Sequence, residues 1–124
     1  MRSNCEDCGA RCHCITLNDY QDAALSTAFY SKSALPPLIY PSLGLAGESG
    51  ELCEKVKKLY RDSNGELTAA QKELMVLELS DILWYVSAFA QELDVSLDYV
   101  ATQGIFKLRS REQRGALRGS GDER

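Results

Sequence analysis

The most apolar stretch of the chain, residues 74–90, reads LMVLELSDILWYVSAFA and is predicted to be helical. At about 100° per residue, its apolar side chains form two stripes that together cover nearly the whole circumference of the helix. The only charged residues in this stretch, Glu78 and Asp81, are three positions apart and therefore lie on one face, inside the second stripe. A carboxylate among apolar neighbours is costly unless a cation or hydrogen-bond donors compensate its charge. The pattern therefore predicts a partner for these two acids.

Two helices are predicted upstream of this stretch. Thr16 and Asp19 have the spacing of a capping box, which begins the first of them. Segment 31–42 contains all three prolines of the chain and is predicted to be a loop that includes Pro41. The second helix is predicted to run from about residue 42 to about residue 60. Its buried residues are expected to be Leu45, Leu52, Val56 and Leu59.

The apolar stretch belongs to a third and longer helix. Thr68 is predicted to cap it, with Gln71 in the capping-box position. This helix is expected to end near Asp94, and Ser96 is expected to begin a fourth. No segment has a convincing strand pattern, so the sequence predicts an all-α fold. So small a set of helices leaves much apolar surface uncovered, and we therefore expect assembly into homodimers or homotetramers.

A second pair of acids repeats the three-residue spacing. Glu48 and Glu51 lie in GLAGESGELCEKVKK, on the predicted second helix. Two helices that each present two acids from one face can enclose a hard cation such as Mg²⁺ or Mn²⁺, because these ions prefer oxygen ligands. The alternative interpretation is that each pair lies on the solvated edge of an ordinary helix.

Together with their flanking residues, the two acid pairs resemble the MazG-like nucleoside triphosphate pyrophosphohydrolases. In this pattern Glu48-x-x-Glu51 is followed, twenty-seven residues after Glu51, by Glu78-x-x-Asp81. The resemblance covers about residues 16–114. Many members have an asparagine where this chain has Gly104. The other matching positions are Gly44, Leu45, Lys55, Ile82, Leu83, Trp84, Tyr85, Lys107, Leu108 and Arg111.

This resemblance implies a four-helix-bundle-like, oligomeric MazG fold that hydrolyses (deoxy)nucleoside triphosphates to the monophosphate and pyrophosphate. It makes Glu48, Glu51, Glu78 and Asp81 the ligands of two or more Mg²⁺ or Mn²⁺ ions, which would neutralise the triphosphate and acidify the attacking water. Glu48 and Glu51 are the better candidates for the catalytic role of orienting or deprotonating that water. A purine nucleotide such as (d)GTP is the favoured substrate. A related dUTP or phosphoribosyl-ATP pyrophosphatase activity is the alternative.

Basic and aromatic residues near the acids are candidates for substrate binding. Lys55, Lys107 and Arg111 can offset charge on the phosphates or on the leaving pyrophosphate. For each of them, the alternative is a place on a solvated helix face. Trp84 and Tyr85 can stack on a base or ribose, but aromatic residues at helical spacing within an apolar run more often pack in a core.

Four of the five cysteines lie close to the N-terminus, at Cys5, Cys8, Cys12 and Cys14, together with the single histidine, His13. In a cytosolic chain such a cluster more often binds a metal than forms disulfides, so a structural zinc site is one prediction. A reduced, mobile tail is the other. The cluster also supports a competing function, a non-enzymatic interaction module built on a small zinc knuckle.

Chain length and net charge bear on the number of domains and on the class of function. A chain of 124 residues is expected to form one domain, and its net charge of −4 argues against general nucleic-acid binding. The polar N-terminus predicts no signal peptide, and the two acids within 74–90 argue against a membrane span, so we expect a soluble cytoplasmic protein. The predicted organisation is a Cys-rich segment at residues 1–15, a helical catalytic domain at 16–114 and a flexible basic tail at 115–124.

Overall fold

The computed structural model describes residues 15–30 and 35–116. Within these ranges all regular secondary structure longer than one turn is helical, which confirms the predicted all-α class. None of the described helices has the length and apolar character that a membrane span requires. The predicted Cys-rich segment and basic tail lie almost entirely outside the described residues. The four helices are α1 (Leu17–Leu25), α2 (Ile39–Ser63), α3 (Ala69–Glu92) and α4 (Leu97–Gln113).

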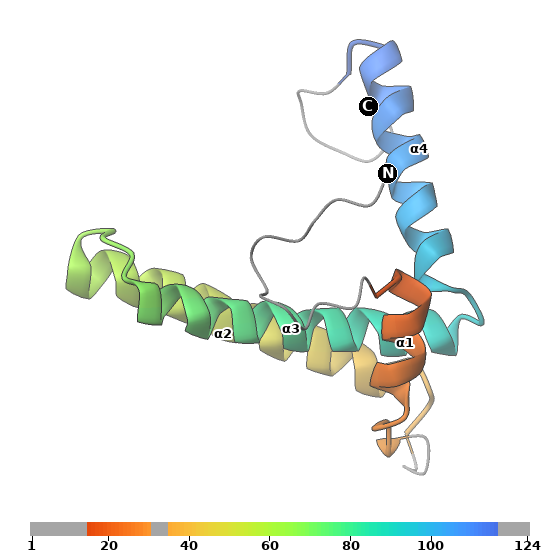
Figure 1. Ribbon diagram of the computed structural model, residues 1–124, viewed down its shortest axis with the longest axis horizontal. Coiled ribbons are helices and arrows are strands. Elements are labelled where there is room, and N and C mark those ends of the chain that lie inside the picture. The colour runs from red at the N-terminus through yellow and green to blue at the C-terminus, as the bar shows by residue number, and fades with distance from the viewer. Residues whose placement is uncertain (1–14, 31–34, 117–124) are drawn as a thin grey trace.

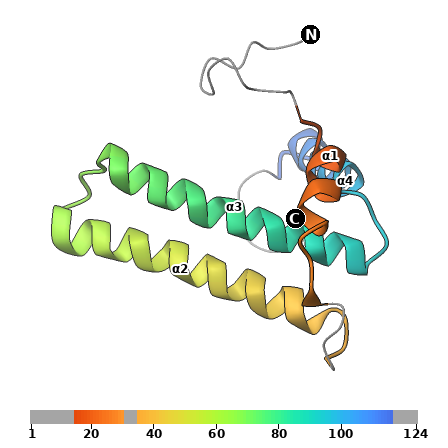
Figure 2. The same cartoon turned by 60° about the horizontal axis from the view of Figure 1, so that its bottom comes forward.

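Helices α2 and α3 form a long antiparallel pair that makes most of the contacts between helices (Figures 1 and 2). The chain reverses direction between them at Asn64 and Gly65, which have φ angles of 50° and 85°. These left-handed conformations suit an asparagine and a glycine at the end of a helix, where the N–H of Gly65 donates to the carbonyl of Leu59 at 3.2 Å. Helix α2 was predicted to end near residue 60 but continues to Ser63.

The predicted helix starts at hydroxyl residues are confirmed. Thr16 and Thr68 each form a complete capping box, with Asp19 and Gln71 as the reciprocal partners. Ser96 caps α4 by accepting the N–H of Tyr99 at 3.1 Å. These side chains bind backbone N–H groups that have no partner within the helix, which is why three of the four helices begin where the sequence predicts.

Helix α2 begins earlier than predicted. Its first residue is Ile39, so Pro41 is the third residue of the helix and not part of a loop, and the prediction for Pro41 was wrong. The first N–H groups of a helix have no intrahelical acceptor, so a proline in the first turn costs no hydrogen bond. The side chain of Pro41 is instead fully buried.

Helix α1 packs across the C-terminal part of α3 (Figures 1 and 2). The buried side chain of Gln21 joins it to the connection between α3 and α4, because Gln21 donates to the carbonyl of Val95 at 3.1 Å and accepts the N–H of Leu97 at 2.8 Å. The indole N–H of Trp84, on α3, donates to the carbonyl of Ala24 at 3.1 Å. These bonds satisfy polar groups at the helix ends and fix α1 against α3.

A small core leaves much apolar surface exposed. Leu59, Ala88 and Leu97 are buried, but Val56, which was predicted to be buried, is 40% exposed, so that prediction was wrong. A helix that is apolar nearly all round, as α3 is, cannot be covered by one long neighbour and a short crossing helix. Helix α4 extends away from the α2–α3 pair (Figure 1). The exposed apolar residues of α3 and α4 include Leu74, Val76, Leu77, Leu79, Tyr99, Val100, Ile105, Phe106 and Leu108.

Candidate active site

A compact group of three carboxylates lies between α2 and α3. Glu48 comes from α2, and Glu78 and Asp81 come from one face of α3. Each offers an oxygen, and the three oxygens lie within 4.8 Å of one another. The antiparallel pairing of the two helices therefore brings together three of the four acids that the sequence singled out. We call Glu48, Glu78 and Asp81 the carboxylate cluster.

The fourth acid, Glu51, is exposed and lies outside this compact group, one helical turn after Glu48 on α2. Its charge nevertheless acts on the cluster. Partial burial raises the pKa of Glu48, and the nearby charges of Glu51, Asp81 and Glu78 raise it further. A carboxyl group that is desolvated beside other carboxylates holds its proton more tightly, and a cation placed among them would reverse this effect.

Lys55 neutralises part of the cluster. Its ammonium nitrogen lies 2.9 Å from Oε1 of Glu78, and this ion pair raises the pKa of Lys55. The carboxylate is well shielded, since Glu78 is only 9% exposed. The sequence predicted a compensating partner for the acids of α3, and Lys55 is one such partner.

An open cavity of about 370 Å³ adjoins the carboxylate cluster. Two of the acids, Glu48 and Asp81, form its polar side. The remaining lining residues are Tyr40, Trp84 and Tyr85, so both aromatic residues that the sequence marked as candidates for stacking face the same space as the acids. Such a combination of flat apolar surfaces and concentrated negative charge can receive a ring system at one end and a cation at the other.

The aromatic wall is held in place by contacts within the fold. The rings of Trp84 and Tyr85 meet edge to face at a centroid distance of 5.0 Å, and the Trp84 indole also donates to Oγ1 of Thr27 at 3.1 Å. Tyr40 stacks on Tyr30 with centroids 4.8 Å apart and an interplanar angle of 7°. Trp84 therefore both lines the cavity and anchors α1.

Comparison with known proteins finds a family match and a relative of this chain. Residues 42–115 match the MazG nucleotide pyrophosphohydrolase domain. The chain belongs to this family. A relative, the "Gene 37 protein" of Mycobacterium phage L5, is 42% identical over 109 residues, which cover 85% of this chain and 96% of that protein. No solved structure matches the chain.

The donor set of this MazG chain fits a divalent cation. All three groups of the carboxylate cluster offer oxygen, the ligand that Mg²⁺ and Mn²⁺ prefer, and their spacing lets one ion touch more than one of them. Burial is the main cause of the raised pKa of Glu48, and the neighbouring negative charges, which a bound cation would offset, add to it.

Helix α4 of the MazG chain carries the two remaining substrate-binding candidates. Lys107 is exposed and Arg111 is half-buried, and neither is among the residues that line the cavity of about 370 Å³ in the described part of the chain. The departure from the family at Gly104 lies on the same helix, where an added Cβ would meet no atom within 4 Å. The predicted zinc ligands Cys5, Cys8, Cys12 and Cys14, and His13 between them, lie outside the described residues.

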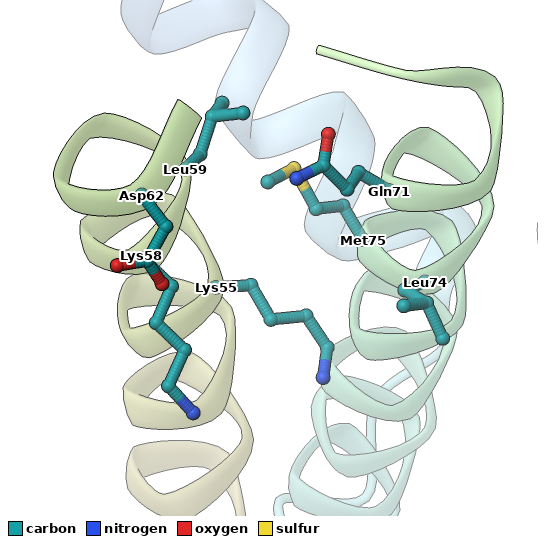
Figure 3. A pocket seen from close by; sticks show the side chains of 7 residues that line it. All are labelled: Lys55, Lys58, Leu59, Asp62, Gln71, Leu74 and Met75. Carbon is teal, nitrogen blue, oxygen red and sulfur yellow. The ribbon is translucent and has the colours of Figure 1, made fainter. Parts of the chain in front are cut away.

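A second cavity, of about 300 Å³, opens between α2 and α3 on the other side of Lys55 (Figure 3). Lys55 reaches across it from α2 towards α3, beside the apolar side chains of Leu74 and Met75. The other residues that line it are Lys58, Leu59, Asp62 and Gln71. This cavity did not follow from the sequence, because it depends on how far apart the two helices lie near the turn.

Among the described residues of the site, sequence reasoning missed Tyr40 and Tyr30. Tyr40 was assigned to the proline-containing loop, where no periodicity relates it to Trp84 or Tyr85. In the structure α2 begins at Ile39, so Tyr40 is helical and lies beside the aromatic pair. This could not be predicted while Tyr40 was assigned to a loop. The single signal in the sequence was that Tyr40 precedes Pro41, and that signal is too general to indicate a site.

Proposed function

We propose that the chain hydrolyses a (deoxy)nucleoside triphosphate to the nucleoside monophosphate and pyrophosphate in a reaction that requires Mg²⁺ or Mn²⁺. The observation that carries this proposal is the position of the carboxylate cluster at the polar side of a cavity with aromatic walls. Membership of the MazG nucleotide pyrophosphohydrolase family supports it independently.

Each part of the site has a role in this proposal. The carboxylate cluster would hold the divalent ions, which supply positive charge to the phosphates and acidify the attacking water when bound. Glu51, exposed one turn beyond Glu48, would extend the metal ligands or orient and deprotonate the water, with Glu48 as the other candidate for that base. Trp84 and Tyr85 would bind the base or ribose by stacking, and we add Tyr40 as a third aromatic wall.

The proposed products follow from where the positive charge is concentrated. Two or more ions at the cluster can bind adjacent phosphates, so the displaced group can leave as pyrophosphate with its charge spread over several oxygens. The chain also has no G-x-x-x-x-G-K-[ST] sequence, the loop that cradles the phosphates in the P-loop ATPases that transfer a γ-phosphate. We therefore expect monophosphate and pyrophosphate in equal amounts, and diphosphates as poor substrates.

A panel of the eight common ribo- and deoxyribonucleoside triphosphates, with phosphorus NMR of each digest, tests the reaction and the substrate together. We favour a purine nucleotide such as (d)GTP, and dUTP and phosphoribosyl-ATP should be included because cleavage of either is the related alternative. Activity should disappear with EDTA and return with Mg²⁺ or Mn²⁺. Inorganic phosphate and a diphosphate as the first products would contradict the proposed mechanism.

The active assembly is proposed to be a homodimer or a homotetramer. Helix α4 leaves the α2–α3 pair with its apolar side chains exposed, including Ile105 and Phe106, and these residues need a partner surface. In such an assembly Lys107 and Arg111 could reach the phosphates bound by a neighbouring subunit. The matched pair of inactive variants described in the Discussion tests this arrangement.

A further inference from the structure

The ion pair between Lys55 and Glu78 differs from the other ion pairs of α2. Lys57 and Lys58 pair with Glu54 within the same helix, and their side chains are more than half exposed. Lys55 instead pairs across the interface with α3, where its side chain is 30% exposed and that of Glu78 is 12% exposed. Water therefore screens this pair less than it screens the surface pairs, and its charge acts on the carboxylate cluster.

The path of the Lys55 side chain explains how the ammonium reaches the cluster. Figure 3 shows the side chain crossing from α2 towards α3 near Met75. The apolar part of the side chain lies along this cavity, and the ammonium extends to Oε1 of Glu78 at 2.9 Å. One carboxylate oxygen of Glu78 is thereby bound to a fixed cation, while Glu78 also belongs to the group that can hold a metal.

Two effects of Lys55 on a metal at the cluster oppose each other. By holding one oxygen of Glu78, Lys55 orders a ligand before the metal arrives. Metal binding then avoids the entropic cost of ordering about one side chain. By placing a positive charge within a few ångströms of the ion, it repels a divalent cation. We expect the repulsion between the two cations to be the larger effect, because it grows with the product of their charges and this half-buried lysine is screened less than a surface lysine.

We propose that Lys55 is a resident counter-cation of the carboxylate cluster. In the protein without metal it neutralises Glu78 and stabilises the contact between α2 and α3, and it lowers the affinity of the cluster for free divalent ions. Lys55 is then a positioning residue whose charge opposes metal binding. This inference rests on the proposed function in one respect, which is that the cluster is the metal site.

The affinity of the metal-free, full-length protein for Mn²⁺, measured by electron paramagnetic resonance without nucleotide, tests the proposal. Lys55→Met keeps an apolar side chain of similar length and removes the charge, so Mn²⁺ should bind about tenfold tighter or more. Lys55→Arg keeps the charge and should bind Mn²⁺ much as the unmodified protein does. Lys58→Met is the matched control, because Lys58 lines the same cavity but pairs with Glu54, and it should leave the affinity within about twofold.

Thermal unfolding provides the second readout. Without metal, Lys55→Met should unfold at a lower temperature, since Glu78 loses its cation beside two other carboxylates. Saturating Mn²⁺ should raise its melting temperature by more than that of the unmodified protein. If Lys55→Met does not fold without metal, Lys55→Gln retains an N–H donor for Glu78 without the charge and should show the same tighter binding.

The possible outcomes separate this inference from the proposed function. If the unmodified protein binds no Mn²⁺, the metal site itself is disproved. If it binds Mn²⁺ and the two uncharged variants bind it equally or more weakly, Lys55 has a purely structural role and the inference is overturned. The same tightening in Lys58→Met would also overturn it, because a general change in surface charge would then be the cause.

Discussion

Among single residues, the members of the carboxylate cluster are the ones on which activity should depend most. Glu48→Gln, Glu78→Gln and Asp81→Asn should each reduce turnover about a hundredfold or more, because each removes a charge that the bound ions need. Glu54→Gln is the control, since Glu54 lies on the same helix but pairs with Lys58 at 3.4 Å. Circular dichroism should show an intact helical fold in every variant. Full activity in any two of the three cluster variants would contradict the proposed site.

Glu51 should behave differently from the cluster. Its carboxylate is exposed and outside the compact group, although its charge contributes to the raised pKa of Glu48. We expect Glu51→Gln to lower kcat strongly while weakening Mn²⁺ binding less than Glu48→Gln does. Steady-state kinetics and Mn²⁺ titrations of the same two preparations measure this difference. Equal losses of metal affinity would place Glu51 among the principal metal ligands.

Tyr30 makes the fold sensitive to alkaline pH. Burial raises its pKa to about 12, and interactions with Glu92 add to this shift. In the unfolded chain a tyrosine ionises near pH 10, so the neutral phenol favours the folded state, and this contribution falls as pH rises from about 10 to about 12. Urea unfolding should therefore show stability declining less steeply above about pH 10 in Tyr30→Phe than in the unmodified protein. If the stability of both proteins fell equally with pH, the pKa of Tyr30 would be the same in the folded and the unfolded chain, which would contradict this prediction.

The sequence predicted the acids but not their partners. Helical spacing was enough to put Glu78 and Asp81 on one face of α3, because that relation is local. The pairing of Glu78 with Lys55, and the exclusion of Glu51 from the compact group, depend on the rotation and separation of α2 and α3. No periodicity within one helix contains that information, so these features had to come from the structure.

Among the elements, the contact of α2 with α3 near Gly44 should be the least tolerant of an added side chain. A Cβ at Gly44 would overlap the ring of Tyr85, whereas a Cβ at Gly50, six residues along the same helix, would meet nothing within 4 Å. Gly44→Ala should lower the free energy of unfolding by about 1–3 kcal/mol, because α2 or Tyr85 must move. Gly50→Ala should raise it by about 0.5–1 kcal/mol through helix propensity. Urea denaturation of both variants measures the contrast.

A second result of Gly44→Ala would show that the close approach matters for the site. Since Tyr85 lines the cavity, its displacement should raise KM for the nucleotide. Gly50→Ala should leave KM unchanged. If both variants were equally stable and equally active, the approach of Tyr85 to the backbone of α2 would not be a constraint on the fold.

The boundaries of the elements show which signals in the sequence were sufficient. Hydroxyl caps with a partner three residues later located the starts of α1 and α3, because the capping interaction is complete within four residues. The start of α2 was misjudged, since Leu38 provides no side-chain cap and Pro41 is compatible with both a loop and a first helical turn. Val56 was expected to be buried because its spacing is correct, but α3 does not cover it.

On the scale of the whole molecule, we expect the exposed apolar residues of α4 to bring chains together in solution. Sedimentation should show a dimer or tetramer, and the melting temperature should rise with protein concentration because association stabilises the folded chain. Phe106, which is 59% exposed, is a suitable position to test. Phe106→Asp should shift the protein towards the monomer and lower its activity. A monomer that retains full activity at assay concentrations would contradict the proposed assembly.

Mixed assemblies test whether Lys107 and Arg111 act on a neighbouring subunit. Glu78→Gln should be inactive alone, and the double variant Lys107→Ala/Arg111→Ala should be strongly impaired alone. If the basic residues serve the partner's acids, a dimer that contains one chain of each kind has one complete site. Random mixing of equal amounts should then restore about one quarter of the original activity. Activity that does not rise above the sum of the two separate variants would place the basic residues in their own chain's site or outside it.

The short turn at Asn64 and Gly65 has a consequence for the order in which the chain folds. Helices α2 and α3 are adjacent in the sequence, so their docking requires the closure of only residues 64–68. Contacts between neighbouring segments form early, because little chain entropy is lost in making them. We therefore expect the acids of the cluster to meet when this hairpin forms, whether or not α1 or α4 has docked. If the cluster binds divalent ions as proposed, we expect these ions to accelerate formation of the hairpin and so to take part in folding as well as in the proposed reaction.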